Sequence, residues 1–290
     1  MMLYFESLET FLNAGRDTLL KGPIGLIFVE DQIEVETTIR HHLDLGFRKL
    51  VVLAMPDVTI SQGLGDRVVR VDYDVKADRA VCDAVNSVIR VSPGTWFYYC
   101  YNAEYLFYPF CEHRSVGEMT VFSTEERRES ILTYVIDLYA GDLWEHPNAV
   151  SIDDAHLDKS GYYALARANP ETNHPEERQL NFFGGLRWRF EEHVPQARRR
   201  IDRIGLFKAK PGLELRPDHT FNEPEYNTYS CPWHNNLTAS ICSFRTAKAL
   251  KRNPGSTFDI ETFRWHNSAP FDWHSQQLLD LGLMEPGQWF

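Results

Sequence analysis

Thirteen consecutive residues, from Trp96 to Tyr108, constrain the fold more than any other stretch of this chain. Eight of them are aromatic, in the order Trp-Phe-Tyr-Tyr-Cys-Tyr-Asn-Ala-Glu-Tyr-Leu-Phe-Tyr. Aromatic side chains favour strands, whereas an asparagine within such a run favours a turn. The stretch therefore predicts a buried strand that runs into a turn.

Three apolar runs precede this strand. The runs at 24–29, 50–53 and 68–71 have the continuous apolar character of strands that are buried on both faces. Helical patterns lie in two of the gaps between the predicted strands, one at 31–45 and one from Ala77 to Val88. This alternation predicts an α/β fold with a mostly parallel central sheet and helices on both faces, which is a three-layer sandwich.

Ligands of such sheets bind beyond the carboxyl ends of the strands. The rule selects the residues that follow each predicted strand, namely Glu30 and Asp31, then 54–57, 72–74 and 101–104. Acidic side chains in this set are candidates for ligand binding: Glu30, Asp31, Asp57 and Glu104. The triplet Asp72-Tyr-Asp74 could be a metal site, although solvated loop carboxylates explain it equally well.

The second half of the chain differs from the first in composition and in the elements that it predicts. A capping-box spacing at Ser123–Glu126 predicts the start of a helix whose apolar stripe continues to Tyr139. Residues 141–234 are rich in Pro, Asn, His, Asp and Arg and predict long loops with short elements. Residues 238–250 predict a helix, or a strand followed by a helix, and the tail at 251–290 is rich in tryptophan and proline.

Composition limits the function classes. The net charge of −11 argues against a nucleic-acid partner or an anionic membrane surface, since both need a basic footprint. Five cysteines without a CxxC pair favour reduced thiols in a cytoplasmic protein. No apolar run approaches the ~20 residues of a membrane span, and the N-terminus does not have the pattern of a signal peptide.

Several segments, in order, resemble the family-2-like glycosyltransferases of the GT-A fold, in a bacterial branch. They are His41–Phe47 with the strand that follows, Trp96–Leu106, Asp137–Tyr139, Asp158–Tyr163, Gly184–Arg189 and Ser243–Arg245. The resemblance covers residues 24 to 250. It implies a nucleotide-sugar-binding domain at 1–250, with an acceptor part at 141–234, and a tail at 251–290 that packs on the core.

The chain departs from the family pattern at its metal site. Tyr101 and Ala103 stand where the family has two aspartates, Ser243 replaces a histidine ligand, and Ala54 replaces an aspartate near the base. Mg²⁺ or Mn²⁺ needs hard oxygen ligands, which Ala and neutral Tyr do not supply. We therefore expect no metal site built from the usual ligands, and no other cofactor.

The resemblance assigns roles to other residues. Glu30, Asp31, Asp57 and Glu104 are expected to contact the nucleotide-sugar donor. Arg187 and Arg189 are expected to neutralise its diphosphate, because guanidinium groups fit phosphate oxygens and stabilise developing negative charge.

Asp153 and Asp154 are candidates for the catalytic base that takes a proton from the acceptor hydroxyl. Three Trp-His pairs, at 233–234, 265–266 and 273–274, could form a platform for the acceptor sugar. The alternative, which we prefer, is that their tryptophans anchor the C-terminal segment on the core.

Two functions follow from this pattern. The first is a cytoplasmic glycosyltransferase-like enzyme that moves a sugar from a nucleotide-sugar to a glycan or other hydroxyl acceptor, with little dependence on metal. The second is a catalytically inactive relative that binds or scaffolds in glycan assembly, which the lost carboxylates favour. A third possibility is an unrelated doubly wound nucleotide-binding protein.

Overall fold

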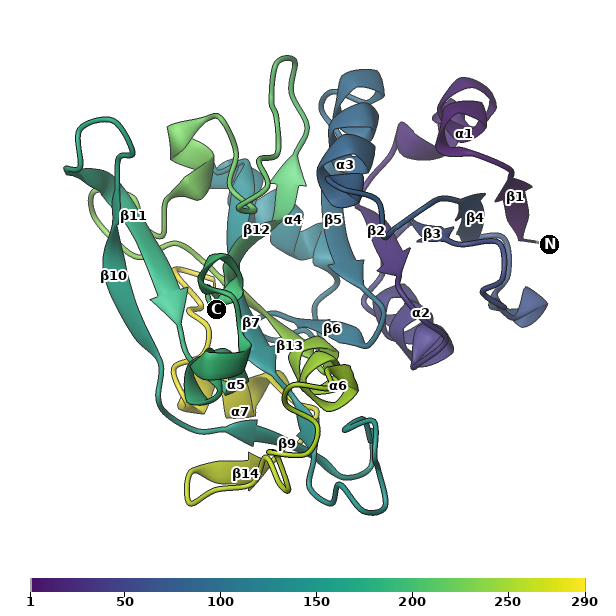
Figure 1. Cartoon of the computed structure of the whole chain (residues 1–290). Helices are drawn as coiled ribbons and strands as arrows, with labels where there is room; N and C mark the ends of the chain where they lie inside the picture. The colour runs from purple at the N-terminus through teal and green to yellow at the C-terminus, as the bar shows by residue number, and fades with distance from the viewer. Residues whose placement is uncertain (1, 290) are drawn as a thin grey trace. The chain divides into compact units, whose positions relative to one another are not determined.

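The computed structural model describes residues 2–289 and has an α/β architecture (Figure 1). Its α-helices are α1 (Leu8–Ala14), α2 (Val35–Asp44), α3 (Ala80–Val91), α4 (Val116–Glu125), α5 (Leu186–Arg189), α6 (Arg245–Arg252) and α7 (Ser275–Asp280). None of the helices in this range has the length and apolar character that crossing a bilayer requires.

A large mixed sheet contains nine of the described strands, in the order β1-β4-β3-β2-β5-β12-β7-β13-β6. These are β1 (Leu3–Phe5), β2 (Ile24–Val29), β3 (Lys49–Ala54), β4 (Val68–Asp72), β5 (Trp96–Tyr101), β6 (Glu104–Phe107), β7 (Ser130–Asp137), β12 (Asp202–Lys208) and β13 (Ala239–Ser243). The strands from β1 to β5 pair in parallel, whereas β12 runs antiparallel to β5.

Two smaller sheets complete the fold. One is the antiparallel pair β10 (Tyr163–Ala168) and β11 (Pro175–Phe183). The other has the order β14-β9-β8, with β8 (Tyr139–Ala140), β9 (Ala155–Asp158) and β14 (Ser268–Pro270). Strands β9, β10 and β11 lie in the region 141–234, whereas β8 precedes it and β14 belongs to the tail. The region 141–234 therefore contains more regular structure than its loop-like composition predicts.

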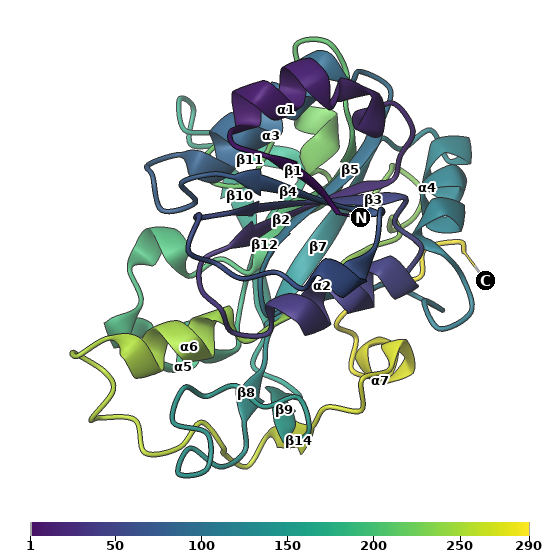
Figure 2. The ribbon, with the colours of Figure 1, turned by 90° about the vertical axis from the view of Figure 1, so that its right-hand side faces the viewer.

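By its internal contacts the chain divides into two units. Unit 1 consists of Met1–Tyr105, Cys111–Leu132 and Ile204–Asn227, and unit 2 consists of Leu106–Phe110, Thr133–Arg203 and Thr228–Phe290. In unit 1, α1 and α3 cover one face of the parallel strands and α2 covers the other (Figure 2). The expected layering of a sheet between helices is therefore present in unit 1.

The prediction of a helix at 123–139 from the capping-box spacing is wrong. Residues Ser130–Asp137 form strand β7, and Ser123 lies near the end of helix α4. The capping box belongs to Ser115, whose hydroxyl accepts from Glu118 N at 3.3 Å while Ser115 N donates to the Glu118 carboxylate at 2.8 Å. Strand β7 is apolar on both faces because it is buried on both, and such a run also satisfies a helical spacing.

Other predictions agree with the structure. Residues 238–250 form strand β13 followed by helix α6.

His42 of α2 is a fully buried histidine with a hydrogen-bonded ring. Its Nδ1 lies 2.7 Å from the carbonyl oxygen of Thr38, and the ring stacks on Tyr98. Burial lowers the pKa of His42 from 6.5 to about 3, with His41 adding to the effect.

This lowered pKa predicts how stability depends on pH. Between pH 6.5 and about 3 the unfolded chain protonates this side chain while the folded chain keeps it neutral. The free energy of unfolding therefore decreases as the pH falls below 6.5, by up to about 1.4 kcal/mol per pH unit. Denaturant unfolding of wild type and His42→Phe from pH 7 to 4.5 should show a flatter profile for the variant.

Substitution of the exposed His113 by Phe is the matched control and should keep the wild-type slope. Parallel profiles for wild type and His42→Phe would contradict the prediction.

Candidate functional site

The strand order of unit 1 contains a topological switch point between β2 and β5. After β2 the chain adds β3 and β4 on one side, and it then returns by way of α3 to add β5 on the other side. The helices of the two crossovers, α2 and α3, lie on opposite faces of these strands (Figure 2). Ligands of open α/β sheets bind at such a point.

Asn102 organises this edge of the sheet. It follows β5 directly, is fully buried, and accepts a hydrogen bond from Glu30 N at 2.9 Å. Its amide nitrogen donates to Asp31 Oδ1 and to the carbonyl of Ile33, both at 2.8 Å. The structure thus brings the predicted residues Glu30 and Asp31 together and fixes their loop. The sequence indicated only a turn at Asn102, not its contacts with this loop.

The neighbouring loop after β3 is fastened in a similar way. Arg70 donates to the carbonyl of Met55 at 3.0 Å and, from Nε, to Asp72 Oδ1 at 3.2 Å. Gln32 exchanges two hydrogen bonds with the backbone of Thr59, at 2.8 and 2.9 Å. These contacts hold the loops after β2 and β3 together at the carboxyl ends of the strands before any ligand binds. Asp57 is exposed there.

The triplet Asp72-Tyr-Asp74 is committed to other contacts. Asp72 accepts from Arg70 and from the hydroxyl of Tyr4 at 2.6 Å. Asp74 accepts from the backbone N–H of Lys76 at 3.0 Å, which closes a turn. Among residues 2–289 no group of three or more His, Cys, Asp or Glu side chains is arranged to hold a metal ion.

Glu104 closes the turn after the aromatic strand. Its Oε2 accepts a hydrogen bond from Tyr101 N at 2.9 Å, and the side chain is buried. Ala103 has a left-handed φ of 59°, and its N–H donates to the hydroxyl of Thr38. Since Glu104 stabilises the turn from inside, it is less suited to contact a donor sugar than its position in the sequence indicates.

Unit 2 contains a buried charged cluster around Asp158. One oxygen of this carboxylate accepts from the Tyr139 hydroxyl at 2.6 Å, from Arg189 at 3.0 Å and from Trp265 Nε1 at 2.8 Å. The Arg189 guanidinium also donates to the carbonyl of Phe263 and lies 4.6 Å from the centre of the Trp265 ring. Arg189 therefore makes five contacts with four groups of the protein itself, namely the Asp158 carboxylate (two contacts), the Phe263 carbonyl and the rings of Phe190 and Trp265.

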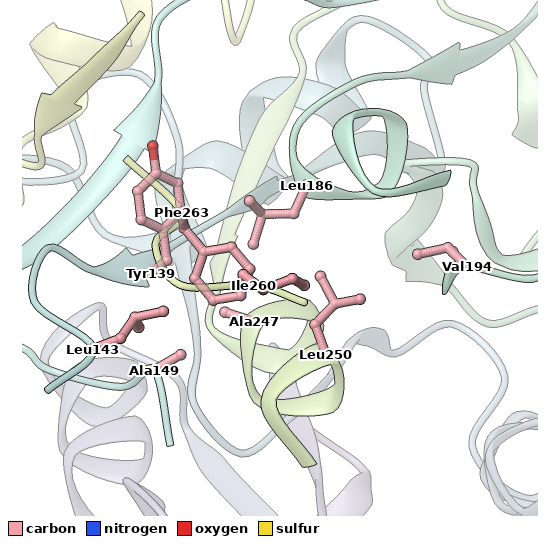
Figure 3. Packing of buried hydrophobic residues seen from close by; sticks show 9 residues of the cluster. All are labelled: Tyr139, Leu143, Ala149, Leu186, Val194, Ala247, Leu250, Ile260 and Phe263. Atoms are coloured by element: carbon pink, nitrogen blue, oxygen red, sulfur yellow. The ribbon is translucent and has the colours of Figure 1, made fainter. Parts of the chain in front are cut away.

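An apolar cluster supports this charged cluster (Figure 3). Tyr139 packs its ring against Phe263 with ring centres 5.7 Å apart, while its hydroxyl reaches Asp158. The buried members come from β8, α5, α6 and the loops next to them: Tyr139, Leu143, Ala149, Leu186, Val194, Ala247, Leu250, Ile260 and Phe263. Their packing fixes α5 and thereby the two arginines that α5 carries.

Asp137 is the second buried carboxylate of unit 2. Burial raises its pKa, while Arg187, whose Nε lies 3.6 Å from Oδ1, acts in the opposite direction. Arg187 also donates to the Thr246 hydroxyl at 3.1 Å and to the carbonyl of Arg200 at 2.7 Å. The two arginines predicted to bind phosphate thus neutralise carboxylates within the protein.

The predicted base candidates differ in their surroundings. Asp153 is exposed, whereas Asp154 accepts from Asp142 N at 3.0 Å. His156 places Nδ1 3.0 Å from the backbone carbonyl of Asp154 and 3.5 Å from its carboxylate. A ring nitrogen that faces a carbonyl carries the proton, so Nε2 has the lone pair and could accept a proton. The sequence analysis did not identify His156, and the spacing Asp-x-His at the start of β9 is the signal that would have indicated the pair.

The tryptophans of the Trp-His pairs do not share one surface. Trp265 binds Asp158, and Trp273 donates to the carbonyl of Ile152 at 3.0 Å and packs against Phe271. These two tryptophans hold the C-terminal segment within unit 2, whereas Trp233 is 87% exposed. The contacts favour anchoring of the tail over an acceptor platform.

Comparisons with known proteins add no family assignment. No protein-family model matches the sequence, and no curated protein is significantly similar to it.

The Asp158 cluster predicts a large effect of charge removal. Asp158→Asn leaves the guanidinium of Arg189 without its counter-charge in a buried place, which typically costs about 3–5 kcal/mol. Asp153→Asn, five residues earlier and exposed, should change the free energy of unfolding by less than about 0.5 kcal/mol. Urea unfolding measures both, and equal effects would contradict the described cluster.

A second prediction concerns Gly185. Its φ is 62°, and a Cβ there would lie 2.9 Å from Asp137 Oδ2. Gly212 has a φ of 78°, but a Cβ there would meet nothing within 4 Å. Both Gly→Ala variants place Ala at a positive φ, and Gly185 also has a ψ of −151°, a conformation that is essentially restricted to glycine. The larger loss expected at Gly185 therefore combines backbone strain with the contact with Asp137. We expect Gly185→Ala to lower the free energy of unfolding by about 1 kcal/mol more than Gly212→Ala, as overpacking does.

Thermal or urea unfolding of the two variants side by side gives this difference. Equal losses would contradict the prediction.

Proposed function

We propose that this chain is a glycosyltransferase-like protein with a GT-A-type fold that binds a nucleotide-sugar without transferring the sugar. Its role would then be binding or scaffolding in glycan assembly. The carrying observation is the pairing of Arg187 with Asp137 and of Arg189 with Asp158. A guanidinium that already neutralises a buried carboxylate supplies little net charge to a departing diphosphate.

Binding itself is supported by the edge of the sheet in unit 1. Asn102 fixes the loop that carries Glu30 and Asp31, next to the switch point between β2 and β5. A loop that is fixed before the ligand arrives loses little conformational entropy on binding. Carboxylates at this position accept hydrogen bonds from ribose or sugar hydroxyls, as an acidic residue does in other doubly wound nucleotide sites.

Transfer of the sugar is the second candidate function, and the pair formed by Asp154 and His156 favours it. The backbone carbonyl and the carboxylate of Asp154 orient the histidine ring, which leaves Nε2 as an acceptor of the proton from an attacking hydroxyl. This route would use no divalent metal ion. Transfer by this route requires groups other than Arg187 and Arg189 to stabilise the leaving diphosphate.

One experiment separates the two functions. Thermal unfolding is followed with UDP-, GDP- and dTDP-sugars, with and without Mn²⁺, and release of nucleoside diphosphate is measured in the same samples. A donor present at about 100 times its Kd should stabilise the fold by about 2.7 kcal/mol. We expect stabilisation that does not depend on Mn²⁺, and no release of diphosphate above the buffer rate.

Glu30→Ala should reduce the stabilisation, whereas Glu36→Ala, on the exposed side of α2, should leave it unchanged. If diphosphate is released and His156→Gln abolishes the release, the protein transfers the sugar and the proposal of binding without transfer is wrong. Absence of stabilisation by every nucleotide-sugar would contradict both.

A further inference from the structure

A cavity of ≈460 Å³ lies in unit 2, between helix α7 and the end of strand β9. Its wall is formed by Lys159, which follows β9, by Ala269 of β14, and by residues of α7 and the loops next to it. Ligand sites in proteins have volumes of about 300–1,000 Å³, so this cavity can hold a small molecule. The residues discussed above for donor binding and proton transfer do not line it.

The pairing of β9 with β14 shows on which face of the small sheet the cavity lies. Ala269 is opposite Leu157 in this antiparallel pair, so the two side chains share a face. Lys159, whose N–H continues the pairing with the carbonyl of Asn267 at 2.8 Å, follows Leu157 by two residues and lies on that same face. Asp158 points to the opposite face. The cavity is therefore separate from the charged cluster around Asp158.

The Trp-His pair at 273–274 is divided between the interior of unit 2 and this cavity. Trp273 donates to the carbonyl of Ile152 and packs against Phe271, whereas His274 lines the cavity. The ring of His274 is held at the start of α7, because its Nδ1 accepts from Gln276 N at 3.1 Å. The tryptophan of the pair thus anchors the tail, and the histidine contributes to the wall.

Hydrogen bonds within the wall fix its shape. The side chain of Gln277 accepts from Asp272 N at 3.0 Å and donates to the carbonyl of Pro270 at 2.8 Å, which ties the preceding loop to α7. The side chain of Gln276 donates to Asp280 Oδ1 at 2.8 Å, one helical turn further on. A wall that is fixed before the ligand arrives loses little conformational entropy on binding.

Three charged groups of the wall select the class of ligand. Across residues 2–289, the ammonium group of Lys159, the carboxylate of Asp272 and Oδ2 of Asp280 have no hydrogen-bonding or ionic partner. The ammonium group only donates hydrogen bonds, and the carboxylates only accept them. An anionic ligand would meet two carboxylates, and a cationic ligand would meet the ammonium group. A neutral ligand with several hydroxyl groups, each of which both donates and accepts, satisfies all three.

We propose that this cavity binds a neutral sugar residue. Its hydroxyl groups donate to Asp272 and Asp280 and accept from Lys159, while Ala269 and Leu281 contact the C–H groups of the ring. That this sugar belongs to the glycan of the assembly role rests on the proposed function. Binding of the sugar itself involves only unit 2.

Saturation-transfer NMR of the full chain tests this site, with glucose, galactose, mannose, N-acetylglucosamine and lactose as probes at millimolar concentration. At least one of them should bind to wild type, and Asp272→Ala and Lys159→Ala should each weaken its affinity at least about tenfold, as loss of a hydrogen bond to a charged group does. Asp259→Ala, an exposed change in unit 2 outside the cavity, is the matched control and should bind as wild type does. Circular dichroism checks that the variants fold.

Absence of binding by every saccharide, or unchanged affinity of both cavity variants, would overturn the proposal. So would binding of glycine or glutamate at this cavity when no saccharide binds there, since the ligand would then be a zwitterion. Glu30→Ala separates this site from the nucleotide-sugar site of unit 1. The variant should lose stabilisation by nucleotide-sugars and keep saccharide binding, and loss of saccharide binding in it would overturn the cavity as the site.

Discussion

A carboxylate buried away from water is stable only when hydrogen bonds and an opposite charge surround it. Asp158 meets this requirement with groups from three separate parts of unit 2: Tyr139 of β8, Arg189 of α5 and Trp265 of the tail. Each of these parts is short and would bury little apolar surface alone. The arrangement of β8, α5 and the tail in unit 2 therefore depends on this charge together with the apolar cluster that joins the same segments.

The same requirement limits the chemistry of the protein. A guanidinium that compensates a buried acid is fixed in place, and its charge is largely cancelled at short range. Arg189 and Arg187 thus contribute to the structure of unit 2 through these ion pairs. In unit 1 the polar contacts have a different effect, since Asn102 fixes loops and leaves the carboxylates of Glu30 and Asp31 at the partly exposed edge of the sheet.

The sequence predicted those elements whose pattern of apolar residues identifies the element by itself. The strands at 24–29 and 68–71 and the helix at 31–45 were predictable because their apolar periodicity is unambiguous. Strand β7 was not, because a strand that is apolar on both faces also fits a helical spacing, and the capping-box signal at Ser123 belongs to no helix start. The ion pairs of Arg187 and Arg189 were not predictable for another reason, since their carboxylate partners lie 31 to 50 residues away in the chain.

The sequence by itself determined the α/β class, the parallel strands of unit 1 and the acidic residues that follow those strands, because hydrophobic periodicity and chain order act over a few tens of residues. Only the tertiary structure decided which of the charges are compensated, which turn Glu104 closes and which side chains line the cavity of unit 2. These properties depend on the distances between groups that are remote in sequence, and electrostatic and hydrogen-bond energies vary steeply with those distances.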